Sequence, residues 1–209
     1  MSRPLPPENM AAVHEEDFAD LCARFQPAPE VWGWIEAHVL DEGGELFNPD
    51  HQHLQSADVS VLWASSGFTK QGRTVVGQAE LVAFRAGGWQ KGRMERQMVD
   101  WFGRVPTAVI TLAADYCATC SDAEFCALVE HELYHLSQET DQYGAPKFHR
   151  DGTACLAMRA HDVDEFVGVV RRYGPSAEVQ RLVEAAKAPP EVAKINIARS
   201  CGTCLLRAA

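Results

Sequence analysis

The sequence predicts an α+β fold, built from short strands and amphipathic helices. Runs rich in β-branched residues occur at 58–65, 73–82 and 107–113, and each has the length of a strand. Apolar residues recur at helical spacing in several of the segments between and around these runs. The composition agrees, since 46% of the 209 residues are hydrophobic and 23% are charged, as is typical of a globular domain.

Two helices and a loop are predicted before the first strand. Residues 11–24 and 28–40 have helical patterns, and the apolar residues of the second recur at i, i+3 and i+4. Residues 41–56 are rich in Gly, Asn, Pro and Asp, a composition that favours a loop.

The middle of the chain predicts strands and one helix. The run at 58–65 alternates, as a strand with one buried face does. A turn near residues 70–73 leads to the run at 73–82. A helix is predicted at 92–103, and the run at 107–113 is the best candidate for a further strand.

A capped helix follows the last strand. Ser121 and Glu124 have the spacing of a capping box, and we expect the helix to continue to about residue 138. Its apolar face is formed by Phe125, Leu128, Val129, Leu133 and Leu136.

The remaining segments predict a loop or small hairpin at 141–160 and helices at 162–173 and 176–187. Turn-forming pairs fill the first segment, and Gly174-Pro175 separates the two helices.

Residues 131–135 read H-E-L-Y-H, which matches H-E-x-x-H. Residues four apart on a helix lie on the same face, so His131 and His135 can direct imidazole nitrogens at one metal ion. Glu132 lies beside them and can reach a water molecule on that ion, as the general base of metal-assisted hydrolysis does.

A catalytic zinc usually takes a third protein ligand, and the residues alone leave its identity open. His161 is predicted to begin a helix and to face the first helix across a cleft, whereas His149 lies in the loop segment. His51 and His53 form an H-x-H in an earlier loop and are more typical of solvated residues. Carboxylate alternatives are Asp162, Asp164 and Glu165.

Two segments resemble the phage-type metallopeptidases, which are relatives of the SprT-like zincins. One is the strand and capped helix ending in VEHELYHL, and the other is HDVDEFVGVVRRYG at 161–174. The resemblance extends over about residues 55–174. The matching positions are His131, Glu132, His135, His161 and Phe166.

This resemblance implies a zinc-dependent metallopeptidase that hydrolyses peptide bonds through a metal-activated water. It implies a zincin-like fold, with a small, mostly antiparallel sheet packed on the H-E-x-x-H helix and a second helix bearing a ligand. It also implies that His161 is the third ligand beside His131 and His135, with Glu132 as the catalytic base.

A peptide substrate could add to the exposed edge of the strand at 107–113, because this strand leads directly into the metal helix. The alternative function is a catalytically silent, zinc-stabilised binding protein, such as a phage-type factor that interacts with a host protein. Glu132 argues against that alternative, since a binding module needs no base beside its metal.

Two C-x-x-C pairs predict a second, structural zinc held by four thiolates. The first pair precedes the capped helix, and the second lies near the C-terminus, so the ion would pin the tail beside the catalytic helix. A redox dithiol and unrelated buried cysteines are the alternatives. The four cysteines are Cys117, Cys120, Cys201 and Cys204.

We expect a single domain over residues 1–209, with N-terminal helices at 1–45, a metallopeptidase core at 55–174 and a tail at 175–209. The net charge of 19 − 29 = −10 argues against a nucleic-acid partner. No apolar run reaches membrane-spanning length, and residues 1–7 lack a signal-peptide pattern. A cytoplasmic protein without a membrane partner is therefore expected.

Overall fold

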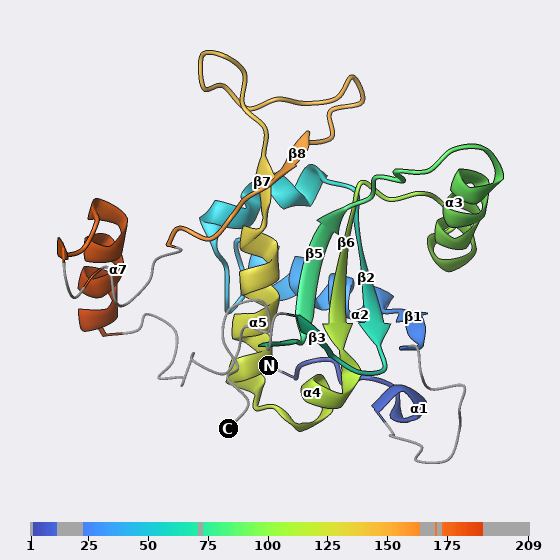
Figure 1. The fold of residues 1–209 in the computed structure, drawn as a ribbon, viewed down its shortest axis with the longest axis horizontal. Coiled ribbons are helices and arrows are strands. Elements are labelled where there is room, and N and C mark those ends of the chain that lie inside the picture. The colour runs from blue at the N-terminus through green and yellow to red at the C-terminus, as the bar shows by residue number, and fades with distance from the viewer. Residues whose placement is uncertain (1, 12–22, 71–72, 164–169, 171–172, 190–209) are drawn as a thin grey trace.

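The computed structural model describes residues 2–11, 23–70, 73–163, 170 and 173–189. Within them, a four-stranded sheet and its helices form the α+β arrangement that was predicted (Figure 1). No described helix has both the length and the apolar character that a membrane crossing requires.

The main sheet has the strand order β1-β2-β6-β5. β1 (Phe25–Pro27) is antiparallel to β2 (Val59–Ala64), and β5 (Gly77–Leu81) is antiparallel to β6 (Ala108–Ala113). The central pair, β2 and β6, is parallel. The sheet is therefore mostly antiparallel, and the strands predicted at 58–65 and 107–113 form its centre.

The expectation that the strand at 107–113 is an exposed edge is wrong. β6 pairs along its whole length with β2 on one side and β5 on the other, so no peptide can add to it. The cause is the run at 73–82, which returns antiparallel to β6 and occupies that edge. The edge strand nearest α5 (Asp122–Tyr134) is β5.

The turn predicted near residues 70–73 joins two additional short strands. β3 (Phe68–Lys70) pairs with β4 (Arg73–Val75) in a hairpin of its own, and β5 begins two residues later. The predicted strand at 73–82 is thus divided between this hairpin and the main sheet.

The N-terminal region contributes α1 (Glu8–Ala11), α2 (Pro29–Ile35) and the π-helical segment η2 (Glu36–Leu40). The last two fulfil the helix predicted at 28–40. The helix predicted at 11–24 lies mostly outside the described residues, and residues 23 and 24 are not helical.

The segment predicted as a loop at 41–56 ends in the 3-10 helix η3 (Pro49–Ser56). Asn48 caps this helix by accepting a hydrogen bond from the backbone N–H of Asp50, and Pro49 occupies the first position, where its missing N–H costs nothing. The same Asn, Pro and Asp residues that favour a loop also favour a helix start.

α3 (Gly88–Phe102) begins four residues earlier than predicted and ends at Gly103, whose φ of 73° only glycine adopts readily. No residue of α3 is buried, and the side chain of Trp89 is 89% exposed. Figure 1 shows α3 on the far side of the sheet from α5.

The chain runs from β6 through the short helix α4 (Ala114–Thr119) into α5, where the predicted capping box is present. The Ser121 hydroxyl accepts from the Glu124 N–H, and the Glu124 carboxylate accepts from the Ser121 N–H. All five residues of the predicted apolar face are fully buried.

α5 ends at Tyr134, earlier than the predicted residue 138. Leu136–Gln138 instead forms β7, which pairs with β8 (Leu156–Met158). The loop or small hairpin predicted at 141–160 is thus a hairpin that begins five residues earlier. The apolar pattern continues because Leu136 packs into the core from the strand. The last described helix is α7 (Ala177–Lys187), close to the predicted 176–187.

Candidate metal centre

Three imidazoles converge at the C-terminal end of α5. The Nε2 atom of His131 lies 3.1 Å from that of His135 and 3.2 Å from that of His161. One ligand atom from each ring lies within 4.8 Å of the other two. Two rings come from successive turns of the helix and its C-cap, and the third comes from the chain after β8.

These distances fit a tetrahedral ion. Two nitrogens about 2.05 Å from one ion, at a tetrahedral angle, lie about 3.3 Å apart. The measured separations of 3.1 and 3.2 Å are close to this value. Neutral imidazoles repel no cation, so the donor set suits a transition metal such as zinc.

His161 does not open a helix, contrary to the prediction. Residues 161–163 are non-helical, and the beginning of the helix predicted at 162–173 lies outside the described residues. The imidazole reaches the site because β8 runs antiparallel to β7, which directly follows His135. The strand pairing returns the chain to the end of α5.

Backbone groups of Arg159 orient His135. The Arg159 carbonyl lies 2.8 Å from His135 Nδ1 and can only accept a hydrogen bond, so Nδ1 carries the proton and Nε2 keeps the free lone pair that a metal could bind. The Arg159 N–H donates to the His135 carbonyl at 2.9 Å. Two bonds between the same residues thus hold the ring's position.

Burial keeps His131 neutral. Desolvation, with smaller contributions from the neighbouring rings of His135 and His161, lowers the pKa of its imidazole to about 4. A neutral ring at physiological pH offers its lone pair to a metal without losing a proton first.

Glu132 is a buried carboxylate at the C-terminal end of α5. The residue is 0% exposed, and neither carboxylate oxygen makes a hydrogen bond of normal geometry. Burial raises its pKa to about 7, and the nearby backbone N–H of Ala79 offsets part of this rise. Such a group is costly unless a ligand or water completes its environment. A buried carboxylate of this kind, next in sequence to His131, fits a site that holds a metal ion and water.

A hollow of ≈ 300 Å³ opens over the histidines. Its wall combines the ring of Tyr134, the half-exposed Arg159 guanidinium and apolar atoms of Val163 and Leu182. Leu182 belongs to α7, so the C-terminal helix also borders the site.

η3 braces the end of α5, a role that the sequence patterns did not reveal. His53 Nε2 lies 2.7 Å from the Leu136 carbonyl, just beyond the helix end. The Tyr134 hydroxyl donates to Asp50 at 3.0 Å, and the Asn48 amide donates to Glu130 at 2.6 Å. The signal available in the sequence was the H-x-H motif, whose histidines support the metal helix and do not reach the imidazole cluster.

The other candidate ligands do not join the cluster. His149 is exposed in the β7–β8 hairpin. Asp162 pairs with the Arg159 guanidinium at 2.6 Å. Asp164 and Glu165 lie outside the described residues.

Cys117 and Cys120 hydrogen bond through their thiols, which raises the pKa of Cys117 and lowers that of Cys120. The Arg3 guanidinium donates to the carbonyls of both cysteines at 2.7 and 2.6 Å and to Asp122 at 2.7 Å. An N-terminal arginine thus ties the first C-x-x-C pair to the start of α5. Cys201 and Cys204 lie outside the described residues.

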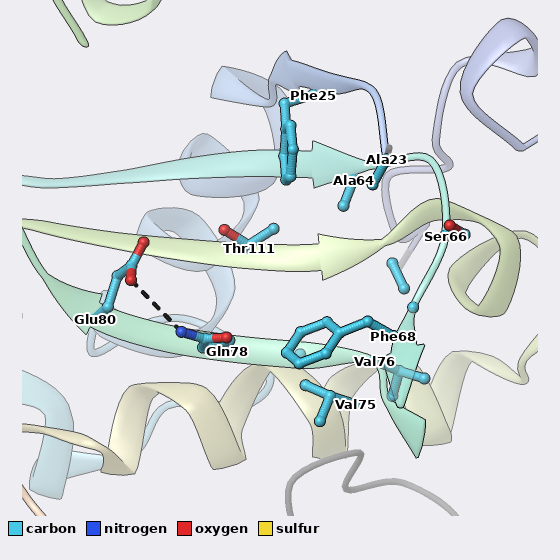
Figure 2. Close-up of a pocket in the computed structure, with 13 residues that line it drawn as sticks. Ala23, Phe25, Ala64, Ser66, Phe68, Val75, Val76, Gln78, Glu80 and Thr111 are labelled. Atoms are coloured by element: carbon cyan, nitrogen blue, oxygen red, sulfur yellow. Dashed lines mark hydrogen bonds between the residues drawn. The ribbon is translucent and has the colours of Figure 1, made fainter. Parts of the chain in front are cut away.

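A second hollow, of ≈ 220 Å³, lies on the other face of the main sheet. Figure 2 shows Gln78 and Glu80 of β5 there, near Thr111 of β6 and the ring of Phe68. It contains none of the clustered histidines. The side chains of Gln78 and Glu80 therefore point away from Glu132, on the opposite face of β5.

Three clustered histidines, two of them in an H-E-x-x-H helix, define a candidate metal centre of the metallopeptidase class. Residues 32–187 match the family described as "putative phage metallopeptidase". This is more than half of the 209 residues, and the chain belongs to that family. The match begins within α2 and takes in the whole of α7, so it is wider than the 55–174 on which the sequence resemblance rested. Comparisons with curated proteins and with solved structures give no match.

Proposed function

We propose that the protein is a zinc-dependent metallopeptidase, a relative of the SprT-like zincins, with His131, His135 and His161 as the zinc ligands. The observation that carries this proposal is the convergence of three imidazoles, one of which is next in sequence to a buried carboxylate that makes no hydrogen bond of normal geometry. Zinc is favoured because its tetrahedral geometry and Zn–N distance reproduce the measured Nε2 separations. A zinc ion in this set would keep one position for water, lower the pKa of that water and polarise the scissile carbonyl.

Glu132 supplies the proton transfers. Its carboxylate accepts a proton from the attacking water and then passes it to the nitrogen of the leaving amine. A pKa raised to about 7 by burial suits both steps, because the group can gain and lose a proton near neutral pH. The hollow above the site admits the side chain next to the scissile bond.

The peptide substrate adds as a strand outside β5, which replaces the earlier assignment to the strand at 107–113. The Val76 carbonyl accepts from Ala113 and the Val82 N–H donates to Thr107. Backbone groups alternate in direction along a strand, so those of Ala79 and Leu81 point away from β6. Ala79 also lies beside Glu132, and a chain on this edge would pass the base.

The experiment that tests this proposal compares Glu132→Gln with wild-type protein on a quenched fluorescent peptide library. We expect zinc content and melting temperature to be retained and cleavage to fall by about 10²-fold or more, the contribution of a general base. Glu139→Gln is the matched control, because Glu139 is a half-exposed carboxylate of the hairpin that pairs with Lys147 and lies outside the histidine cluster. Cleavage by Glu132→Gln at the wild-type rate would falsify the mechanism.

The alternative is a catalytically silent, zinc-stabilised protein that binds a host partner. It predicts that wild-type protein holds zinc in the histidine site yet cleaves no member of the library, and that Glu132→Gln changes nothing. The buried Glu132 disfavours this alternative, since binding zinc structurally does not require a buried carboxylate.

We further propose a structural zinc shared by Cys117, Cys120, Cys201 and Cys204. Four thiolates around Zn²⁺ carry a net charge of −2, and the Arg3 guanidinium beside the first pair would offset it. The cysteines that the structure describes are free thiols, which agrees with the proposed cytoplasmic location.

A further inference from the structure

Gly77, the first residue of β5, is the point at which the edge strand meets Glu132. A Cβ atom built on Gly77 would lie 2.7 Å from Glu132 Oε1 and 2.7 Å from Leu128 Cδ1. It would lie 3.2 Å from Glu132 Cδ. Ordinary van der Waals contact begins at 3.4 Å, so any side chain here overlaps the carboxylate.

The need for glycine at this position comes from space and not from backbone conformation. Gly77 is not among the described glycines with positive φ, and its backbone lies in a regular antiparallel ladder with β6. Any residue could adopt that conformation. What excludes them is the carboxylate that fills the place of the side chain.

We propose that Gly77 is a positioning residue, a notch in β5 that receives the Glu132 carboxylate and sets where the general base lies. This inference rests on the proposed function. α5 fixes the backbone of Glu132 from one side, and the backbone of Gly77 limits the carboxylate from the other. Both walls are rigid, because α5 packs in the core and β5 is hydrogen bonded to β6.

An added methyl group would therefore move the carboxylate and leave the walls in place. Relief of the overlap requires a shift of roughly 0.7 Å, the difference between 3.4 and 2.7 Å. Leu128 is fully buried and has little room to move. A misplacement of about 1 Å at a reacting group can cost about 100-fold in rate, and we expect an effect approaching that size here.

The first measurement compares the kinetics of Gly77→Ala with those of Gln78→Ala. Gln78 is the adjacent residue of β5, but its side chain lies on the opposite face of the sheet, in the second hollow (Figure 2). We expect Gly77→Ala to lower kcat by about 100-fold with KM changed much less. Zinc per chain should equal that of wild type, and Gln78→Ala should keep the wild-type kcat.

The second measurement is a rescue with Glu132→Asp, whose side chain is one methylene shorter. If the methyl group acts by displacing the carboxylate, adding Gly77→Ala to Glu132→Asp should cost much less than the 100-fold seen in wild type. An equal loss in both backgrounds would mean that the methyl group acts elsewhere, and the proposal would be overturned.

A double-mutant cycle of melting temperatures tests the contact between Gly77 and Glu132 without an activity assay. Gly77→Ala should lower the melting temperature of wild type but lower that of Glu132→Ala clearly less, while Leu128 is unchanged in all four proteins. Equal shifts in both backgrounds would overturn the proposal. If Gly77→Ala alone does not fold, folding of the double variant supports the proposal and its failure to fold overturns it.

These outcomes are distinguishable from failure of the proposed function. Wild-type protein that binds zinc and cleaves no peptide would refute the peptidase, and the double-mutant cycle would still test the notch. Wild-type protein that cleaves peptides, with Gly77→Ala equally active, would refute the notch alone.

Discussion

At the scale of single residues, His135 both ends a helix and belongs to the histidine cluster. It has φ −70° and ψ −19°, still in the helical region, although the chain turns into β7 directly afterwards. His135, the C-cap of α5, is therefore the last residue that can still lie on the same helix face as His131, four residues before it. The Arg159 carbonyl then fixes the ring, so the position of the ring depends on strand pairing as much as on the helix.

His161→Ala should lower zinc affinity by about 100-fold or more, at least as much as loss of a group that only orients a ligand. The reason is that its Nε2 lies 3.2 Å from that of His131, within the first coordination sphere of any shared ion. Competition with a chromogenic chelator measures the affinity. His149→Ala is the control and should leave it nearly unchanged, because that residue is exposed in the hairpin. Zinc bound instead by His149, Asp164 or Glu165 would refute the ligand set.

The buried His51 should make the free energy of unfolding depend on pH. Its side chain is 1% exposed and packs on the ring of Tyr134. Burial, with smaller contributions from His53 and Arg159, lowers the pKa of His51 to about 4, against the opposing effect of Asp50. The unfolded ring titrates near 6.5. The stabilisation is therefore complete above pH 6.5 and is lost as the pH falls from 6.5 towards 4.

The expected loss in the free energy of unfolding is at most about 3 kcal/mol. Urea denaturation of wild type and His51→Phe, between pH 7.5 and 4.5, measures it. The difference between the two proteins should change with pH, since contributions common to both, such as those of the clustered histidines, cancel. Parallel pH profiles of the two proteins would contradict the assignment of this effect to His51. The Glu130 carboxylate lies 3.8 Å from His51 Nε2, and any stabilisation of the protonated ring by Glu130 is part of the difference that is measured.

At the scale of elements, α5 carries the site because both of its ends are fixed. Its N-terminus has the capping box and the Arg3 hydrogen bonds, and its C-terminus is held by η3 and by the β7–β8 hairpin. One face is fully buried against the sheet. The helix therefore holds His131 and Glu132 as a rigid body, whereas α3 and α7 have no buried residues.

Ser121→Ala should lower the free energy of unfolding by about 1 kcal/mol, the usual cost of a lost N-cap. Urea denaturation measures the change. Ser176→Ala removes the equivalent cap of α7, where Ser176 accepts from the Val179 N–H. Because α7 buries no residue, its cap should affect global unfolding by less than about 0.5 kcal/mol. Equal effects of the two substitutions would show that α7 is as tightly coupled to the core as α5.

At the scale of the whole molecule, residues distant in sequence complete each part of the candidate centre. Arg3 reaches α4 and α5, and η3 supports the metal helix from far upstream. Leu182 of α7 borders the hollow from the C-terminal side. The family match from 32 to 187 spans nearly all of these elements.

Metal content tests the proposed tail site. Wild-type protein should carry two zinc ions per chain, and Cys201→Ser with Cys204→Ser should carry one, with a lower melting temperature, because thiolate sites form together with the fold. Elemental analysis after gel filtration gives the ratio. The histidine site should remain occupied, since its ligands lie on other elements. One zinc per chain in wild type, with that site filled, would end the proposal of a second ion.

The sequence by itself determined the features that depend on short-range patterns. Alternation at 58–65, the Ser121 and Glu124 spacing and the H-E-x-x-H motif each involve residues within one strand or one helix. Backbone geometry links such neighbours directly, so β2, the capping box and the shared face of His131 and His135 follow without knowledge of the rest. The convergence of His161 required more, and came from resemblance to a family.

Only the tertiary structure decided which strand lies at the edge, where α5 stops and which residues surround Glu132. β6 is central because β5 pairs with it, and α5 ends because β7 finds a partner in β8. Gly77 has no positive φ that the sequence pattern could have indicated. Its proposed role follows from its closeness to Glu132, a residue far along the chain. Such long-range pairings depend on core packing and on the choice of strand partners. The periodicity of a short sequence segment cannot predict them.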